Sequence, residues 1–335
     1  MVVTGYGDAL EPADLPEPEL RPGTARLEIL TCGVCFSDVK TARGKMPFSE
    51  TLTLPHVCGH EICARVVETD PDGALETGTV VVVYHVWPCR RCDRCRAGAE
   101  QLCRQPEAWA GFSHPGGFQE QLVAPLDRLN VVPDAIDPVH AAPLTCALGT
   151  AYRAVLTRGR VAAGANVGVI GLGGVGIHAL QIAHAAGARA TGTDVSARAL
   201  EVARELGLRV AAPEELVARG RAAAGVDVVI DTVGTAATVA QAEQLVRPGG
   251  RIVAVGYGVD RSLELPSARF VLEEIEVVGS RYVARDELER AIRLVADGRV
   301  QTVVDRVLPL ERADEAFAAL EAGEVVGRVV LEVAA

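Results

Sequence analysis

Apolar and polar residues alternate regularly along the second half of the chain. From about residue 165, short apolar runs are followed by a glycine-containing turn and then by a segment whose apolar residues have helical spacing. These patterns predict strands at 166–170, 188–193, 226–231, 251–255 and 275–278, and helices at 175–186 and 197–206. From this point to about residue 282, the repeated strand–turn–helix units favour a doubly wound parallel sheet, an α/β fold.

The first half has a different pattern. Short apolar runs at 25–30, 64–68, 79–84 and 117–124 are separated by Pro and Gly residues, which is typical of strands joined by turns. Residues 1–147 are therefore predicted to form a β-rich domain. Residues 283–335 contain two amphipathic segments, at 286–297 and 311–322, and we expect each to be a helix followed by a strand.

Length and charge narrow the class of protein. The 335 residues suit two domains, and 33 Lys and Arg against 44 Asp and Glu give a net charge of −11. Such an acidic chain is a poor partner for nucleic acid or an anionic membrane. No apolar run approaches the roughly 18 residues that cross a bilayer, and the N-terminus does not resemble a secretion signal. We expect a cytoplasmic protein.

Four of the nine cysteines form a dense cluster. Cys89, Cys92, Cys95 and Cys103 are separated by two, two and seven residues. Four thiolates at these spacings can surround a structural zinc ion, and the odd cysteine count argues against a disulfide framework. A bacterial ferredoxin cluster would need a final spacing of three and a proline, whereas Arg104 follows here. A nucleic-acid zinc ribbon would need a basic face, which the net charge disfavours.

A glycine-rich turn joins the first strand of the α/β part to its first helix. Gly171, Gly173 and Gly176 fit G-x-G-x-x-G, with Gly174 and Val175 inside the motif. The first glycine permits the tight turn, the second lets the backbone approach a pyrophosphate, and the third lets the helix lie close to the strand. The sequence therefore predicts a dinucleotide site at this helix N-terminus.

The end of the next predicted strand indicates which dinucleotide binds. Asp194 lies 23 residues after Gly171 and can accept hydrogen bonds from the ribose hydroxyls. Its charge would repel a 2′-phosphate, so we expect NAD in preference to NADP. Arg198, four residues further on, could soften that preference.

Three further residues are candidates for a second metal site. Cys35, His60 and Cys146 lie in predicted loops or turns, within TCGVCFSD, CGHE and TCALGT. Two thiols and an imidazole would leave a fourth position open on a catalytic zinc ion. A single Cys is more often a small buried hydrophobe. From the residues alone, a metal site and ordinary packing both remain open.

Taken together, these motifs resemble those of the zinc-containing medium-chain alcohol dehydrogenases. GVCFSD, GHE, the four cysteines, the Cys146 region, GLGGVG and the terminal pair Gly327 and Arg328 occur in the family's order, and the resemblance covers nearly the whole chain. It implies a GroES-like catalytic domain at 1–147 with a structural zinc lobe at 89–103, a Rossmann NAD-binding domain at 148–282, and a segment at 283–335 that returns to the catalytic domain. In this family the active site lies in the cleft between the domains.

The resemblance also implies roles for individual side chains. Cys35, His60 and Cys146 would hold the catalytic zinc, and Glu61 would be the acid beside it. Ser37 matches the hydroxyl that bonds the substrate oxygen and starts a proton relay. Asp38 matches the carboxylate that orients the ligand His.

Cofactor contacts and the reaction follow from the same resemblance. Thr150 and Val175 match positions beside the nicotinamide, and Arg328 matches a residue that reaches the pyrophosphate. The implied activity is zinc-dependent hydride transfer between an alcohol, or its carbonyl, and NAD(H). The alternative is a zinc-independent enoyl or quinone reductase of the same superfamily, whose members usually lack the set of Cys35, His60 and Cys146.

The chain departs from the family at Lys40, where many relatives place the His that ends the relay. A solvated Lys and a relay member both remain open at this position. His85 and Trp109 lie in regions that flank the substrate in relatives. The sequence leaves open the small-molecule substrate, the direction of the reaction, and whether the chain forms a homodimer or a homotetramer.

Overall fold

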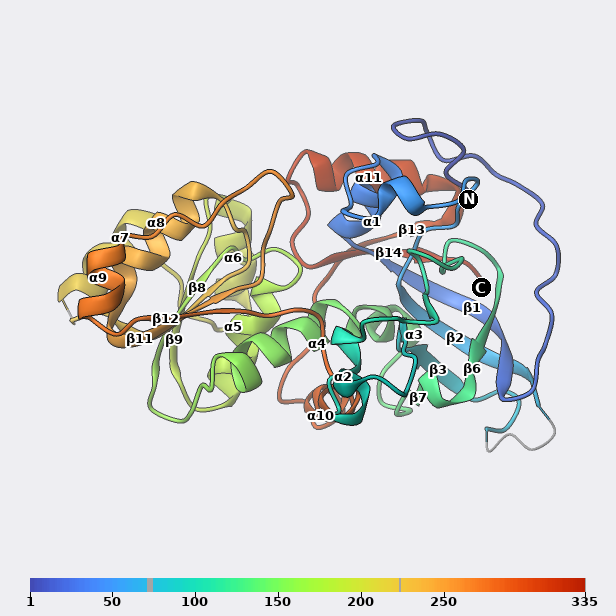
Figure 1. Cartoon of the computed structure of the whole chain (residues 1–335), viewed down its shortest axis with the longest axis horizontal. Helices are drawn as coiled ribbons and strands as arrows, with labels where there is room; N and C mark the ends of the chain where they lie inside the picture. The colour runs from blue at the N-terminus through green and yellow to red at the C-terminus, as the bar shows by residue number, and fades with distance from the viewer. Residues whose placement is uncertain (71–74, 223, 335) are drawn as a thin grey trace. The chain divides into compact units, whose positions relative to one another are not determined.

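The computed structural model describes residues 1–70, 75–222 and 224–334, and the chain divides into two compact units (Figure 1). Unit 1 comprises Met1–Cys146, Ala284–Ala296 and Val304–Ala335, and unit 2 comprises Ala147–Val283 and Asp297–Val303. The chain therefore leaves unit 1 twice and returns twice. The second excursion, at 297–303, falls inside the C-terminal segment that the sequence analysis treated as one piece.

Unit 1 is built on a seven-stranded sheet with the order β13-β14-β1-β2-β3-β7, in which β6 also pairs with β1. Its strands are β1 (Thr24–Val34), β2 (Glu61–Thr69), β3 (Val80–Val83), β6 (Gln121–Pro125), β7 (Leu129–Val131), β13 (Val304–Pro309) and β14 (Arg328–Glu332). Strands β13 and β14 are parallel, and the other pairs are antiparallel. Val34 pairs with Val329, so the end of β1 lies beside the start of β14.

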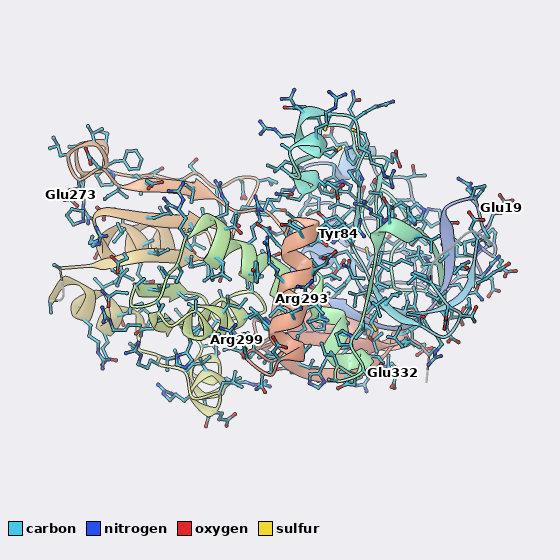
Figure 2. The ribbon with its side chains drawn as sticks, turned by 90° about the horizontal axis from the view of Figure 1, so that it is seen from below. Glu19, Tyr84, Glu273, Arg293, Arg299 and Glu332 are labelled. Atoms are coloured by element: carbon cyan, nitrogen blue, oxygen red, sulfur yellow. The ribbon has the colours of Figure 1, made fainter. Side chains whose placement is uncertain are left out.

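Short helices and a small second sheet complete unit 1. The helices are α1 (Phe36–Ala42), α2 (Asp93–Arg96), α3 (Pro138–Ala141), α10 (Arg285–Ala296), on which Arg293 is labelled in Figure 2, and α11 (Ala313–Glu321). Strands β4 (Val86–Trp87) and β5 (Ala108–Trp109) form the second sheet. Single 3-10 turns occur at Ser49–Thr51, Glu100–Leu102, Leu126–Arg128, Ala142–Leu144 and Leu310–Arg312. The core includes the fully buried Leu27, Ile62 and Phe118, and the ring centroid of Phe118 lies 6.1 Å from that of Phe317.

Unit 2 contains a five-stranded parallel sheet with the order β12-β11-β10-β8-β9. Its strands are β8 (Asn166–Ile170), β9 (Arg189–Thr193), β10 (Val226–Asp231), β11 (Val246–Ala254) and β12 (Glu276–Gly279). Its helices are α4 (Ala147–Tyr152), continued by a π-helical turn at Arg153–Arg158, then α5 (Gly176–Ala185), α6 (Ala197–Glu205), α7 (Pro213–Ala222), α8 (Ala236–Leu245) and α9 (Ser267–Leu272). The predicted doubly wound α/β architecture is confirmed.

The strand order reverses between β8 and β10, which is where such sheets bind ligands at the carboxyl ends of their strands. Val210 continues the sheet beyond β9 through a single parallel bridge to Gly192. With Val210 counted as a rudimentary third strand, the order is that of a dinucleotide-binding sheet. The turn after β8, which carries the glycine motif, lies at the reversal.

One predicted strand starts later than expected. The apolar run at 117–124 becomes a strand only from Gln121, because the backbone of Gly116 and Gly117 packs directly against the CGHE segment. The Gly117 amide donates to the Gly59 carbonyl at 2.7 Å, and a Cβ on Gly117 would lie 2.7 Å from the Cys32 sulfur. Gly116 and Gly117 therefore pack against neighbouring segments and do not pair with another strand.

Within the described residues, none of the helices has both the length and the apolar character that crossing a bilayer would require.

Candidate active site

Asp38 connects three parts of the candidate metal site. It lies in the first turn of α1 and is fully buried. One carboxylate oxygen accepts the Cys35 amide at 2.8 Å. The other accepts the Gly59 amide at 3.1 Å and lies 2.9 Å from His60 Nδ1. Because a carboxylate can only accept, Nδ1 carries the proton and Nε2 is left as the ligand atom.

Gly59 is required by the turn that presents His60. Its φ of +95° lies in the left-handed region, and a Cβ there would come within 2.5 Å of the Phe118 ring and 2.8 Å of the Cys32 sulfur. The CGHE segment therefore needs glycine for conformation and for space. It leads directly into β2, which begins at Glu61.

Four side chains of unit 1 converge at this point. One ligand atom from each of Cys35, His60, Glu61 and Cys146 lies within 4.8 Å of the others. Cys35 precedes α1, His60 precedes β2, and Cys146 is the last residue of unit 1 before α4. Two thiols, an imidazole and a carboxyl group form a donor set that suits zinc.

Arg328 provides positive charge beside these groups. Its Nε lies 2.9 and 3.0 Å from the two oxygens of Glu61, and its Nη2 lies 3.6 Å from the Cys35 sulfur. The pairing of Val34 with Val329 explains the contact, since the next residue after β1 is Cys35 and the first residue of β14 is Arg328. Burial raises the pKa of Glu61 to about 7, and the Arg328 guanidinium limits that rise.

The surroundings of Cys35 favour its thiolate form. A hydrogen bond from Cys146 lowers the pKa of Cys35 well below its usual value, burial opposes the shift, and the nearby Arg328 supports it. Burial disfavours a charged His60, but the charge and hydrogen bond of Asp38, with Cys35, raise the pKa of His60 well above its usual value. A metal cation could therefore replace the protons that Cys35, Cys146 and His60 share in these hydrogen bonds.

Aromatic rings surround His60. Its ring centroid lies 4.7 Å from that of Phe112 and 5.1 Å from that of His85. Phe48 and Trp109 extend the group, with centroids 5.7 and 6.3 Å from that of Phe112. Ring packing on this side shields the imidazole from water.

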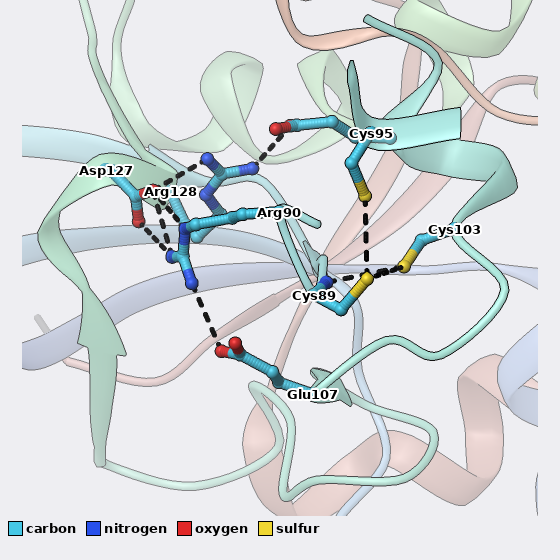
Figure 3. Close-up of polar contacts among 8 residues, drawn as sticks. Cys89, Arg90, Cys95, Cys103, Glu107, Asp127 and Arg128 are labelled. Atoms are coloured by element: carbon cyan, nitrogen blue, oxygen red, sulfur yellow. Dashed lines mark hydrogen bonds and ion pairs between the residues drawn. The ribbon is translucent and has the colours of Figure 1, made fainter. Parts of the chain in front are cut away.

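The four-cysteine lobe brings its sulfur atoms together. Figure 3 shows three of them, those of Cys89, Cys95 and Cys103. The Sγ–Sγ distances are 3.4 Å for Cys92–Cys95, 3.5 Å for Cys89–Cys103, 3.9 Å for Cys89–Cys95 and 4.0 Å for Cys92–Cys103. A tetrahedral zinc ion with Zn–S bonds of about 2.3 Å would place its sulfurs about 3.8 Å apart. Backbone hydrogen bonds from Arg104 and Cys95 lower the pKa of Cys92 to about 6, which favours the thiolate. The lobe thus fits one zinc ion with no open position.

A chain of ion pairs ties the lobe to the body of unit 1, as Figure 3 shows. Arg90 follows the first lobe cysteine and binds both oxygens of Asp127 at 2.9 Å, with Glu107 at 3.2 Å. Arg128, almost fully buried, binds Asp127 at 2.8 Å and reaches Glu100 inside the lobe at 2.6 Å. The lobe is therefore held by charged groups at both of its ends.

The glycine turn in unit 2 leaves open space where a ligand would approach. At Gly173 a Cβ would meet nothing within 4 Å, whereas at Gly176 it would lie 1.7 Å from the Gly171 carbonyl oxygen. Gly171 has φ +84°, and a Cβ there would strike Val233 and Thr232. The second glycine thus faces free space, and the first and third are needed for the turn itself, as a dinucleotide cradle requires.

Asp194 holds the glycine turn to the end of β9. One of its oxygens accepts the Leu172 amide at 2.6 Å, and the other accepts the Ser196 amide at 2.8 Å. The Ser196 hydroxyl in turn accepts the Ala199 amide at the start of α6. Each carboxylate oxygen of Asp194 keeps a second acceptor position for a ribose hydroxyl.

Comparison with known proteins agrees with this geometry. Residues 174–297 match the family model described as zinc-binding dehydrogenase, and residues 21–134 match the alcohol dehydrogenase GroES-like domain. An alcohol dehydrogenase of Geobacillus stearothermophilus is 32% identical over 337 residues, which cover 99% of this chain and 98% of that protein. The chain belongs to the zinc-containing medium-chain dehydrogenase family.

Solved structures of the family share the fold over nearly the whole chain. The crystal structure of AibC is 34% identical, with a TM-score of 0.90 over 99% of this chain and 94% of that one. A structure of an NAD-dependent alcohol dehydrogenase is 31% identical, with a TM-score of 0.92 and 99% of both chains covered. The chain is thus an oxidoreductase of the alcohol dehydrogenase type.

The remaining residues predicted from the family resemblance lie in several places. Ser37 is half-buried in the first turn of α1, two residues after Cys35, and Thr150 is buried in α4 of unit 2. Val175 precedes α5, and Arg198 is exposed on α6. A contact of Arg328 with a pyrophosphate stays a prediction. In the structure the guanidinium is buried against Glu61 and Cys35.

Two sets of buried ion pairs in this protein were not predicted from the sequence. The pair of Arg328 and Glu61 spans 267 positions, and no local pattern signals it. The chain of ion pairs around Arg128 was also not foreseen, although a charged residue beside a buried strand would have been a signal. Both place a buried guanidinium next to a cysteine cluster.

Proposed function

We propose that this protein is a zinc-dependent alcohol dehydrogenase that transfers a hydride between an alcohol, or its carbonyl, and NAD(H). The observation that carries the proposal is the convergence of Cys35, His60, Glu61 and Cys146 within 4.8 Å. A zinc-independent reductase of the same superfamily has no need of such a donor set. The glycine turn of unit 2 supports the dinucleotide part of the proposal.

Cys35, His60 and Cys146 would hold the catalytic zinc, and the four lobe cysteines would hold a structural one, giving two ions per chain. Bound there, zinc would act as a Lewis acid that eases deprotonation of the alcohol oxygen, and NAD would accept the hydride. Asp38 keeps His60 in the tautomer that offers Nε2. The buried Arg328 offsets the negative charge of Glu61 and Cys35.

Side chains of unit 1 would also transfer the proton that leaves the alcohol hydroxyl. In the proposed reaction Ser37 would accept the hydrogen bond of the alcohol hydroxyl. As it gains the alcohol proton, it would release its own hydroxyl proton to a ribose hydroxyl of the cofactor and from there to water. Lys40 lies one turn further along α1, where its Nζ is 5.7 Å from the Phe36 ring centroid. The rings of Phe112, His85 and Trp109 would exclude water and pack against an apolar part of the substrate.

NAD is the dinucleotide that the residues of unit 2 favour. In support of this, the carboxylate of Asp194 follows β9 and is already fixed by two backbone amides, so it would be available to a ribose hydroxyl. A 2′-phosphate there would meet this negative charge. An Asp194→Ser variant should therefore lower kcat/KM with NAD and raise it with NADP. A variant that leaves the NAD to NADP ratio unchanged would argue against this role.

The experiment for the proposal is a screen of alcohols and carbonyls with NAD(H) and NADP(H), followed by absorbance at the nicotinamide band. We expect turnover with an alcohol and NAD that Cys146→Ser abolishes, with zinc content falling from two ions to one per chain. Cys63→Ala, which removes a buried thiol of β2 outside both clusters, should keep both ions and the activity. Full turnover by Cys146→Ser would contradict the proposal.

The assembly and location of the protein are further parts of the proposal. We expect a homodimer or homotetramer, as the family resemblance implies, and a location in the cytoplasm. Sedimentation equilibrium distinguishes these states from a monomer of 35.2 kDa. A monomer at assay concentrations would contradict this part without affecting the chemistry.

A further inference from the structure

The short crossing segment of unit 2, residues 297–303, lies along helix α5, which begins at the glycine turn. Arg299, labelled in Figure 2, donates from Nη2 to the Ala185 carbonyl at 2.8 Å. The Gln301 amide and carbonyl pair with the side-chain amide of Gln181, each at 3.0 Å. The Val303 amide donates to Nε2 of His178 at 3.0 Å.

These contacts follow a simple pattern. The backbone groups of residues 301 and 303 both face the helix, as alternate positions of an extended chain do. They meet Gln181 and His178, which lie three apart on one face of α5, and the Arg299 side chain reaches the Ala185 carbonyl one turn further along. The segment therefore runs antiparallel to α5, and the side chains of Gln181 and His178 provide hydrogen bonds to its backbone. Both flanking residues of the segment, Ala296 and Val304, belong to unit 1.

His178 connects this segment to the glycine turn. Its Nδ1 lies 2.6 Å from the carbonyl oxygen of Gly174, which is inside the motif. A carbonyl can only accept and the Val303 amide can only donate, so Nδ1 carries the proton and Nε2 accepts. The imidazole is fully buried and neutral in this arrangement. One ring in one tautomer thus holds two backbone groups 129 positions apart, from residue 174 to residue 303.

We propose that His178 is a positioning residue for the dinucleotide turn, which it shapes through Gly174 and couples to the docking of the crossing segment through Val303. This inference rests on the proposed function, because it assumes that the turn binds a dinucleotide. A dinucleotide bound at the turn would restrict the motion of the Gly174 carbonyl and so of the His178 ring bonded to it. The restricted ring would in turn hold Val303 and the segment 297–303. His178 is thus proposed to act on the turn through its bond to Gly174 and on the segment through its bond from Val303.

Two conservative variants separate the two bonds. In His178→Asn the side-chain NH2 lies near the place of Nδ1, so it can still donate to Gly174 but no longer reaches Val303. In His178→Gln the amide oxygen lies near the place of Nε2, so it can still accept from Val303 but leaves Gly174 unbonded. His184→Gln changes an exposed histidine of the same helix and serves as the control.

The first readout is NADH affinity, followed by fluorescence titration. We expect His178→Gln to raise the Kd for NADH about fivefold, the effect of one net hydrogen bond, whereas His178→Asn and His184→Gln stay within about twofold of wild type. Equal Kd values for the Asn and Gln variants would overturn the positioning role. Zinc content should remain unchanged in all three, which separates this effect from damage to unit 1.

The second readout is hydrogen exchange of the segment 299–303, with and without NADH. Wild-type protein should show slower exchange when NADH is bound, and His178→Asn should lose that protection while still binding NADH. Unchanged exchange in the wild type on NADH binding would overturn the coupling, even if a variant fails to fold. If wild-type protein binds no NADH at all, the proposed function fails and the inference fails with it. Tight NADH binding with unaffected variants overturns the inference alone.

Discussion

Asp38 shows how a single buried carboxylate can organise a candidate metal site. Its three partners are the amide of Cys35 just before α1, the amide of Gly59 and the imidazole of His60, so this imidazole is fixed relative to the Cys35 backbone. All three partners donate, and this matches a carboxylate that has only acceptor positions. An amide in its place would direct an N–H group at one of these donors.

Asp38→Asn should therefore weaken zinc binding at the candidate catalytic site. We expect the affinity to fall about tenfold to a hundredfold, as is usual when the partner of a ligand histidine is lost. Competition with a chelator of known affinity measures the change. Asp137→Asn is the matched control, because Asp137 also bonds a histidine, His140, but on an exposed helix end. Equal affinities in wild type and Asp38→Asn would contradict the orienting role.

Arg328 compensates charge that cannot be solvated. Arg328→Met would leave Glu61 and Cys35 buried without their guanidinium partner, so we expect the free energy of unfolding to fall by about 3–5 kcal/mol. Arg43 also binds a glutamate, Glu321, through two nitrogens, but this pair is partly exposed. Arg43→Met should cost only about 0–1 kcal/mol. Urea unfolding of the zinc-loaded proteins tests the difference, and similar losses in both variants would contradict it.

His56 should make the stability of unit 1 depend on pH. It is buried and its Nε2 donates to the Gly111 carbonyl at 3.2 Å, and burial lowers its pKa from 6.5. The unfolded chain therefore binds this proton more readily than the folded one, so stability decreases as pH falls below 6.5. Between pH 6.5 and 5.5 we expect wild type to lose up to about 1 kcal/mol more than His56→Gln. Urea unfolding at both pH values measures this, and parallel losses would refute it.

At the scale of elements, we expect the cysteine lobe to depend on a bound zinc ion for a fixed shape. Its only regular parts are the four-residue helix α2 and the 3-10 turn at 100–102, among the described residues between 89 and 103. Such short elements have little stability of their own. The ion pairs of Arg90 and Arg128 fix the ends of the lobe, and the four thiolates would fix its centre.

Cys95→Ser should therefore release one zinc ion per chain and loosen the lobe. Because Arg91, Arg94 and Arg96 lie exposed inside it, trypsin should cleave the variant there much faster than wild type. Metal analysis and mass spectrometry of the fragments measure both effects. Cys63→Ala again serves as the control and should keep its zinc and its resistance. A variant that retains two zinc ions and resists trypsin would show that the lobe does not depend on the metal.

The elements of unit 2 were predictable where apolar residues contrast strongly with their surroundings. The predicted bounds of the strands at 166–170 and 226–231 agree with β8 and β10. Helices α7 and α8 were not predicted. In α8 the buried positions include Ala242 beside Val239 and Leu245, and alanine gives little contrast with the exposed residues around it. Helices α7 and α8 can be recognised from their packing in unit 2, but not from the spacing of apolar residues in the sequence.

At the scale of the whole molecule, the candidate site was predictable only through the family resemblance. Residue spacing left open whether Cys35, His60 and Cys146 meet, because their convergence depends on the strand pairing of unit 1. The contact of Arg328 depends on the register between β1 and β14, which links the two ends of the chain. The glycine turn, by contrast, is a local feature, and its strand, turn and helix were read directly from the sequence.

The central claim is that three side chains of unit 1 hold a zinc ion with a position left for substrate. Anomalous diffraction at the zinc edge, from crystals of protein purified without chelators, tests it most directly. We expect two peaks per chain, one inside the cysteine lobe and one about 2.3 Å from the sulfurs of Cys35 and Cys146 and about 2.1 Å from a nitrogen of His60. A peak in the lobe alone, unchanged after soaking in zinc, would contradict the account.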